Sequence, residues 1–445
     1  MGYWALFAVL TAGVGAAAIA IRGAPTPLRT PLLVYNVLYV VTSAVGATAL
    51  GDPTVRALWM LSQPTMDASW LTAWDKTTYW CLVWAPLLLV NLSARIFYRR
   101  FQLAGRAVSR WTDLGVQPIS IAAVAVVMFT YCLLNLALHG YLGFGLLDVT
   151  SDANYRLNIQ LRTEMAGVLG AWQFGLVYMA LPAACVVALL VAIRRRTISA
   201  WLLTAVLSAM IVLLDGITRT KSHLLVFALA LVLASSFAGL LRWRGVLLAG
   251  VIGIALLAIQ ESLLGGGIGI DWLGALANVI FRMASGIPFY VDIFPSQIPF
   301  VGIDLGQSAI GFAPGLAPNI EVANLMNPTE TWVQSSVPAP AHVAAYAQAG
   351  VAWSFVVMAA VGVFLAFVGQ VLASARSEIG VALGIGGCIS GYYMTQTDFA
   401  GAFLHAYGFK WWVLTIVLLI IVQRVLVRAQ GGLVVKPLHF PGKAG

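Results

Sequence analysis

Long apolar stretches recur along this chain, and they constrain its fold more than any other feature. A helix needs about 20 mostly apolar residues to cross a bilayer, because every backbone N–H and C=O must be bonded inside the segment. Eleven stretches qualify: Tyr3–Ile21, Leu32–Leu50, Thr77–Leu92, Ile119–His139, Val168–Ile193, Ile198–Leu214, His223–Leu241, Val246–Leu264, Val351–Leu372, Gly380–Thr395 and Trp411–Val425. They predict an all-α polytopic membrane protein, with about 11 transmembrane helices in one integral membrane domain over residues 1–445.

The composition agrees with a chain that is solvated by lipid. Hydrophobic residues make up 61% of it and charged residues only 9%, against about 25% charged in soluble domains. Four cysteines fall inside apolar stretches, where a small soft side chain packs, so we expect neither disulfides nor cysteine chemistry. The first stretch has no basic residues before it and is interpreted as a retained span rather than a cleaved signal.

Lys and Arg are distributed unevenly between alternate loops. One set of loops and the carboxyl-terminal segment hold 17 of the 25 Lys and Arg but only two acids, Asp113 and Glu378. Cytoplasmic loops carry such an excess, so the amino terminus is predicted outside and the carboxyl terminus inside. The basic pI of about 9.5 is then a topology signal, and we expect no nucleic-acid partner.

The long connections fall on the predicted outer side. They are residues 51–76, 140–167 and, longest, 265–349, which lies between the eighth and ninth spans. A connection of that length is usually functional. It is Pro-rich and apolar, so we expect it to lie on the membrane surface, with short interfacial helices such as Ile270–Ser285.

Cations on the outer side are candidate ligands for phosphate. Arg219 and Lys221 sit in a tight turn between the sixth and seventh spans, where a guanidinium fork and a point charge can hold a diphosphate. The alternative is an interfacial anchor that reaches toward lipid headgroups. Arg282 is a second candidate, with an ordinary ion pair to Asp292 or Asp271 as its alternative.

Arg156 and Arg162 are further phosphate-binding candidates in the second outer loop. Their spacing of six places them on different faces of a helix, so one faces the site while the other is solvated.

A general base must lie on the same side of the membrane. His342 precedes the ninth span, and an imidazole takes a proton near neutral pH. Its alternative is a surface histidine. The rival bases are Asp292, Asp304, Glu321, Glu164 and His405. Carboxylates and aromatic rings of the outer loops suit sugar binding, and the candidates are Tyr290, Tyr346 and Glu164.

Several motifs are absent from the sequence. It contains no Walker A loop, metal-ligand cluster or nucleophile elbow. We therefore expect neither metal nor cofactor, and a substrate that is already activated. A polyprenyl-diphosphate sugar is such a donor, because the diphosphate is its own leaving group.

Three stretches resemble the oligosaccharide repeat-unit polymerases, also called O-antigen or Wzy-type polymerases. Residues 216–222, with Arg219, resemble the family's short Gly/Ser-Arg-Ser/Thr turn. Phe281–Arg282 followed by residues 290–295 is similar to the pattern of an arginine and then an aromatic-Phe-Pro segment in the large periplasmic loop. Residues 345–350 resemble the small-Tyr-x-x-Phe-Gly entry to the next span, with Ala349 in place of the aromatic residue.

The resemblance implies glycosyl transfer at the periplasmic face of a bacterial inner membrane. The growing undecaprenyl-diphosphate glycan is the donor, and a hydroxyl of the incoming lipid-linked repeat unit is the acceptor. Arg219 and Arg282 bind the diphosphate, and His342 or a loop carboxylate such as Asp292 is the base. A large-span (GT-C-like) glycosyltransferase architecture and a chain-length regulator as partner follow by analogy.

Two other functions stay open. An O-antigen ligase uses the same donor and transfers the glycan to the lipid A core. A transporter or flippase of lipid-linked oligosaccharide belongs to a different class, which shows repeat symmetry and charged helices near the midplane. Here the span interiors carry almost no charge, and Asp215 and Glu261 lie toward the outer ends of their spans, which disfavours transport.

Overall fold

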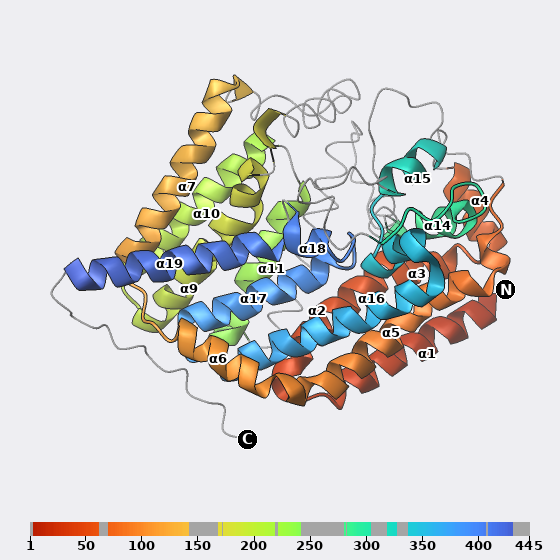
Figure 1. Cartoon of the computed structure of the whole chain (residues 1–445), viewed down its shortest axis with the longest axis horizontal. Helices are drawn as coiled ribbons and strands as arrows, with labels where there is room; N and C mark the ends of the chain where they lie inside the picture. The colour runs from red at the N-terminus through yellow and green to blue at the C-terminus, as the bar shows by residue number, and fades with distance from the viewer. Residues whose placement is uncertain are drawn as a thin grey trace. The chain divides into compact units, whose positions relative to one another are not determined.

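Helices make up all the regular secondary structure in the part of the chain that the structure describes (Figure 1). The structure is a computed structural model. It describes residues 3–61, 70–141, 168–170, 172–218, 221–241, 280–281, 283–303, 318–326, 337–405 and 408–429. The prediction of an all-α chain is confirmed over these ranges.

Seven described helices are long and apolar enough to cross a membrane. They are Thr26–Ala49, Thr77–Thr112, Pro118–Leu138, Trp172–Arg195, Ile198–Asp215, Ala341–Ser374 and Gly401–Ala429. Phe7–Arg22 and His223–Phe237 are shorter apolar helices at two further predicted spans. The multi-pass membrane character is thereby supported, while the count of eleven remains a prediction, since Val246–Leu264 lies outside the described residues.

The chain divides into two units, which we describe separately. Unit 1 comprises Met1–Phe101, Leu273–Gly369 and Ser390–Leu404, and unit 2 comprises Gln102–Trp272, Gln370–Ile389 and His405–Gly445. Each unit is thus assembled from segments that lie far apart in the sequence.

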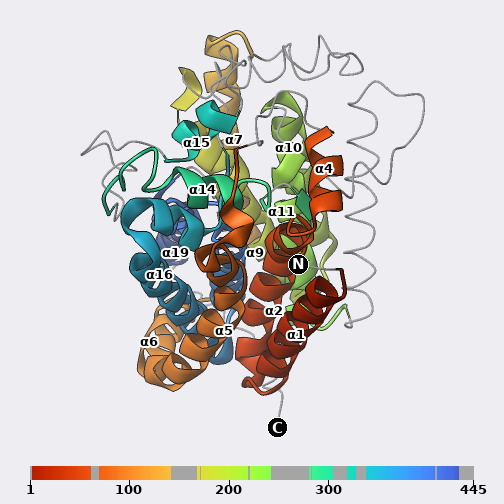
Figure 2. The ribbon, with the colours of Figure 1, turned by 90° about the vertical axis from the view of Figure 1, so that its right-hand side faces the viewer.

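Unit 1 is built on helices that lie side by side (Figures 1 and 2). Its elements are α1 (Tyr3–Arg22), α2 (Thr26–Tyr39), the π-helical turn η1 (Val40–Ala44), α3 (Val45–Ala49), α4 (Pro53–Leu61), the short turn η2 (Ala73–Asp75), α5 (Thr77–Tyr98), η3 (Arg99–Phe101), α14 (Ile287–Ile293), α15 (Pro318–Met326), most of α16 (Ala341–Ser374), the end of α17 (Glu378–Tyr393) and α18 (Gly401–Leu404). Turn η1 joins α2 to α3 without a break, so the three form one span.

Small residues and one amide pair hold these helices together. Gly362 of α16 faces Ser93 and the backbone of Val90 on α5, which lets the two helices approach closely. Asn36 and Asn91 exchange side-chain hydrogen bonds of 3.1 and 2.9 Å between α2 and α5. Each amide thereby finds a partner inside an apolar bundle, where a free polar group is costly.

The charges of unit 1 are segregated along its helices. Arg95 donates to the carbonyl of Ala20 at 2.6 Å, so α1 and α5 end together. This basic end holds Arg22, Arg29, Arg95, Arg99 and Arg100. The opposite end, called the acidic end below, holds Asp52, Arg56, Asp75, Lys76, Asp292 and Asp398. This is the charge asymmetry that the sequence predicts for a membrane protein, and the orientation of the termini remains a prediction.

Unit 2 surrounds one deeply buried helix. Its elements are α6 (Gln102–Thr112), α7 (Pro118–Leu138), the π-helical turn η5 (Leu176–Ala180), α9 (Leu181–Arg195), α10 (Ile198–Thr218), α11 (Lys221–Phe237), α19 (Phe409–Ala429) and most of α17. Every residue of α9 from Leu181 to Ala192 is buried, because α7, α10, α11 and α19 pack around it.

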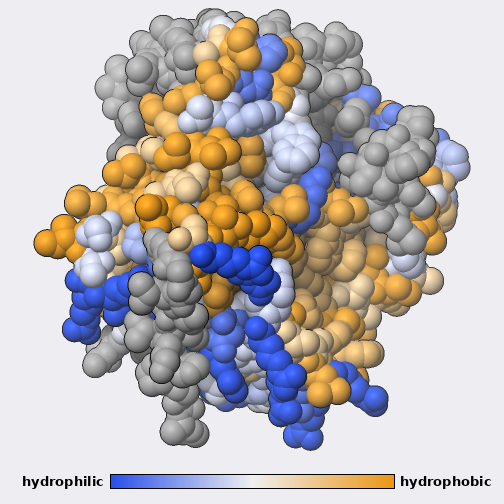
Figure 3. All heavy atoms as spheres, turned by 60° about the vertical axis from the view of Figure 1, so that its left-hand side comes forward, coloured by the Kyte–Doolittle hydropathy of each residue, from blue (hydrophilic) through white to orange (hydrophobic). Residues whose placement is uncertain are grey.

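The outer surface of unit 2 is apolar along its helices. The exposed large apolar side chains of α7 are Ile119, Val126, Val127, Tyr131, Leu134 and Leu138. Figure 3 shows apolar side chains over much of the face that comes forward, with hydrophilic ones gathered below them. At the end of α9, Arg194 pairs with the buried Glu378 at 2.9 Å. Apolar side chains exposed in this way suit a surface that faces lipid.

The contact at Gly362 yields a test of helix packing. In Gly362→Ala the new methyl group meets the Ala94 nitrogen at 3.0 Å and the Val90 carbonyl still closer, so α16 must move away from α5. We expect the free energy of unfolding to fall by about 1–3 kcal/mol, measured as a lower melting temperature in nanodiscs. Gly15→Ala is the matched control, because nothing lies within 4 Å of its added methyl group. Equal melting temperatures for the two variants would contradict the close approach of α16 and α5.

Candidate substrate site at the acidic end of unit 1

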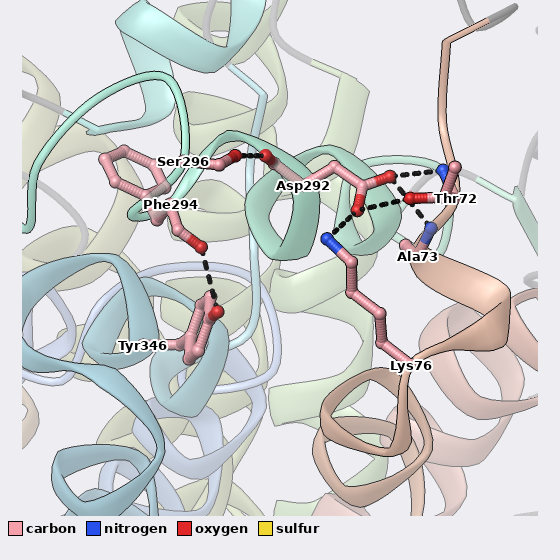
Figure 4. Close-up of polar contacts among 7 residues, drawn as sticks. All are labelled: Thr72, Ala73, Lys76, Asp292, Phe294, Ser296 and Tyr346. Atoms are coloured by element: carbon pink, nitrogen blue, oxygen red, sulfur yellow. Dashed lines mark hydrogen bonds and ion pairs between the residues drawn. The ribbon is translucent and has the colours of Figure 1, made fainter.

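Asp292 is the centre of the polar contacts at the acidic end (Figure 4). It lies on α14, and its side chain is only 5% exposed. Its carboxylate accepts hydrogen bonds from the backbone N–H of Thr72 and Ala73, at 2.5 and 2.8 Å, and from the Thr72 hydroxyl at 3.4 Å. The ammonium group of Lys76 forms an ion pair with the same carboxylate.

These contacts give Asp292 a structural role. A buried carboxylate is costly unless it is paired and hydrogen-bonded, and segment 70–76 supplies both kinds of partner. The carboxylate in turn fixes that segment against α14, more than 200 residues away in the sequence. Both oxygens are engaged, so a proton transfer to Asp292 would compete with these bonds, and its role as a base remains a prediction.

Arg56 is placed by its neighbours on α4 and in turn η2. Asp52 caps α4 by accepting from the N–H groups of Thr54 and Val55, at 2.8 and 3.2 Å. These hydrogen bonds stabilise its charged form and lower the pKa of Asp52. The Arg56 guanidinium carbon lies 4.1 Å from the centroid of the Trp74 ring, which is a cation–π stack.

Tyr290, a predicted substrate contact, is buried on α14. Its side chain is 1% exposed, and its hydroxyl donates to the Val337 carbonyl at 3.2 Å. Burial, together with the nearby charge of Asp398, raises the pKa of Tyr290 well above its ordinary value. The phenol therefore stays neutral and serves packing in this arrangement.

Tyr346, the other predicted aromatic contact, joins residues 345–350 to residues 290–295. Its hydroxyl donates to the Phe294 carbonyl at 2.9 Å (Figure 4). The ring of Phe300 packs edge-on against the Tyr346 ring, with centroids 5.9 Å apart. Residues 290–295 and 345–350, separated by about fifty positions in the chain, thus lie against each other.

The helix that carries Tyr346 is broken just after it. Ala349 and Gly350 leave the helical conformation, and Gly350 has φ +80°, a value that favours glycine. The carbonyls of Ala347 and Gln348 instead accept from the N–H groups of Val301 and Gly302, at 3.1 and 3.0 Å. The predicted span from Val351 begins directly after this break, but the helix starts ten residues earlier, at Ala341.

His342, the predicted base, lies within the core of unit 1. Its Nε2 is 2.8 Å from the Leu82 carbonyl and 3.5 Å from the Tyr39 hydroxyl. The Ser354 hydroxyl donates to the His342 carbonyl across the helix break, at 2.7 Å. The residue is 2% exposed, so an acceptor hydroxyl does not reach the ring in this arrangement. The catalytic role of His342 stays a prediction.

The remaining predicted site residues lie outside what the structure describes. These are Arg156, Arg162, Glu164, Arg219 and Arg282, together with the side chain of Lys221 at the start of α11. Most of the predicted interfacial helix Ile270–Ser285 is also outside the described ranges. Ile280 and Ala284, which flank Arg282 in the sequence, lie against Gly46 of α3 in unit 1.

Sequence reasoning missed Arg56, Thr72, Trp74 and Lys76 as members of this end. Arg56 and Lys76 were visible as two of the few outer-loop cations, and Trp59, Trp70, Trp74 and Trp80 cluster around them in the sequence. That combination of cations and indole rings was the available signal. Among the described side chains, Arg56 and Lys76 are the cations at this end that can hold an anion, and no group of three metal-ligating residues forms.

Comparisons with protein-family models, with curated proteins and with solved structures gave no match.

The contacts of Asp292 predict that it anchors segment 70–76. Asp292→Ala removes the acceptor of two backbone N–H groups and the partner of Lys76, so the segment should detach from α14. We expect trypsin to cut after Lys76 at least about tenfold faster, which corresponds to a loss of about 1.4 kcal/mol, within the range for a charged hydrogen-bond partner. Asp75→Ala, which changes an exposed carboxylate in the same segment, serves as the control. Cleavage at the wild-type rate in Asp292→Ala would show that the segment is held by other contacts.

Proposed function

We propose that this protein is a periplasmic-face polymerase of lipid-linked oligosaccharides in a bacterial inner membrane. It joins undecaprenyl-diphosphate-linked repeat units into O-antigen, capsule or exopolysaccharide. The growing chain is transferred from its lipid to the incoming lipid-linked repeat, and undecaprenyl diphosphate leaves.

The observation that carries this proposal is the contact between residues 290–295 and 345–350. These are two of the three stretches on which the resemblance rests, and Tyr346 bonds to Phe294 between them. They adjoin the acidic end of unit 1, which carries charged and aromatic side chains. This end lies at one end of helices that are long and apolar enough to cross a membrane. A lipid-linked sugar needs such a boundary, with apolar helices for the polyprenyl chain and polar groups for the glycan.

In the proposed reaction, the acceptor hydroxyl attacks the anomeric carbon of the donor sugar. A new C–O bond forms, the bond to the diphosphate breaks, and the hydroxyl proton passes to a base. His342 is the first candidate for that base and Asp292 the second. Arg219, Arg282 and Lys221 stabilise the charge that develops on the departing diphosphate, with Arg156 and Arg162 as additional cations. Tyr346 and Glu164 are assigned to the sugar side, while Tyr290, first predicted as a sugar contact, packs on α14.

The assignment of the arginines is tested by laddering in a reconstituted reaction. Purified protein in liposomes receives synthetic undecaprenyl-diphosphate repeat units, and the products are resolved by gel. We expect Arg219→Ala and Arg282→Ala each to lower the rate by about 10²-fold or more, since single charge-stabilising groups contribute on that scale. Arg100→Ala, at the basic end of unit 1, is the matched control.

Full ladders from both arginine variants would remove those residues from the site. A wild-type protein that forms no ladder, but transfers glycan when lipid A core is added, would identify a ligase instead.

The role of His342 is tested by separating rate from stability. Loss of a general base costs about 10²–10⁴-fold in rate, so His342→Gln should keep its melting temperature within a few degrees while polymerisation nearly stops. Tyr35→Phe is the control, because it alters a buried ring in the same bundle that stacks on Tyr39, not on the imidazole. A His342→Gln protein that melts much earlier, yet polymerises normally while folded, would assign the histidine to packing.

A further inference from the structure

Among the described residues, Arg56 has no ion pair, although its position on α4 favours one with Asp52. Asp52 precedes it by four residues, the spacing at which oppositely charged side chains on a helix meet. The Asp52 carboxylate is instead engaged by the N–H groups of Thr54 and Val55. Among the described residues, no acid lies within salt-bridge distance of Arg56.

The stack on Trp74 orients the guanidinium of Arg56. Its carbon lies over the indole, 4.1 Å from the ring centroid, so the ring restrains the position of the group. A guanidinium has five N–H donors in one plane, and the described residues supply no carboxylate for them, so donors can be directed at an oxyanion in a bidentate geometry. Arg56 is partly exposed, which leaves room for a ligand.

Lys76 provides a second cation two residues beyond Trp74. Asp292 takes one of its three donors, and the side chain is 43% exposed. The ion pair therefore holds the ammonium in place without burying it. A fixed guanidinium and a fixed ammonium on neighbouring segments suit a phosphate group better than a neutral ligand.

The position of α4 indicates that the phosphate belongs to a membrane lipid. The helix follows the span Thr26–Ala49 after only three residues, so it lies close to where that span leaves the bilayer. Leu58, two residues after Arg56, is 64% exposed. A short helix that follows a span and carries both an exposed apolar side chain and a cation suits the region between acyl chains and headgroups.

We propose that Arg56, oriented on Trp74, and Lys76 bind the phosphate group of a membrane-anchored lipid, and that this lipid is the undecaprenyl-diphosphate acceptor. The choice of that lipid rests on the proposed function. A transfer between two lipid-linked substrates requires two diphosphate sites, because the acceptor keeps its diphosphate while that of the donor leaves. Arg219 and Arg282 are assigned to the donor, so Arg56 and Lys76 supply the second site.

Native mass spectrometry of the full chain, released from phosphatidylcholine nanodiscs, tests this site by counting bound undecaprenyl diphosphate. We expect two lipids on the wild type and one on Arg56→Gln, which keeps an amide to stack on Trp74 but loses the charge. The affinity for the second lipid should fall by about tenfold or more, the scale of one charge-assisted hydrogen bond. Arg56→Lys should lie between the two, and Arg100→Ala should match the wild type.

Two lipids on Arg56→Gln with unchanged affinities would overturn the site. If inorganic pyrophosphate displaced the second lipid at equal concentration, the lipid assignment would be overturned, because the polyprenyl chain would then contribute nothing to the affinity. Phosphatidylglycerol that displaces it equally well would likewise assign the cations to general headgroup binding. Lys76→Gln repeats the test independently if Arg56→Gln does not fold.

The ladder assay separates this inference from the proposed function. A protein that forms no ladder but loses one bound lipid in Arg56→Gln has the lipid site without the polymerase activity. A protein that forms ladders and keeps both lipids in Arg56→Gln has the polymerase activity without this site.

Discussion

The need to pair every backbone polar group inside hydrocarbon governs this structure. It explains why helices make up all the regular secondary structure of the described residues, and also how a break in a helix is accommodated. Where α16 breaks at Ala349 and Gly350, the released carbonyls of Ala347 and Gln348 are met by N–H groups from residues 301 and 302. Side chains follow the same rule: the Asn36 and Asn91 amides pair with each other, and Arg194 accompanies Glu378. These departures from an apolar helix are thus matched by partners from distant parts of the chain.

The same need for hydrogen-bond and ion-pair partners explains the cluster of polar contacts at the acidic end of unit 1. Asp292 is buried, so it draws in two backbone N–H groups, a hydroxyl and an ammonium, all from segment 70–76. That segment then presents Trp74 to Arg56 and keeps Lys76 at the surface. One buried carboxylate therefore sets the position of both cations. Tyr346 and Phe294 connect this arrangement to the broken helix, so the α14 region links elements drawn from three separate parts of unit 1.

The sequence predicted the spans better than the site. The predicted starts at Thr77 and Ile198 coincide with the observed helix starts, and that at Ile119 is one residue late, because hydrophobicity is a local property. The predicted span start at Val351 corresponds to the break in α16 rather than to the start of that helix. Residues 341–348 are too few to form a span, so hydrophobicity alone did not predict that they are helical. Asp292, Tyr290 and Tyr346 were all predicted within one outer loop, but their contact partners were not predicted. Thr72 and Ala73 lie about 220 residues from Asp292, and no local pattern encodes such a pairing.

Charge placement carries information in two ways in a chain like this one. The basic end of unit 1 follows the topological excess of arginine, so an individual cation there needs no further explanation. At the acidic end the topological excess of arginine does not explain the presence of a cation, so each cation there needs its own physical reason. Lys76 has one, because it neutralises the buried Asp292. Arg56 has no acidic partner among the described residues and lies over an indole ring, although Asp52, whose carboxylate caps α4, lies four residues before it. A surface ion pair with Asp52 would contribute little, about 0.2–1 kcal/mol, so the helix cap and the aromatic stack can outcompete it. The consequence is a guanidinium that is held in place without a carboxylate partner from the described residues, and a cation that is already positioned binds an anion with less loss of side-chain entropy.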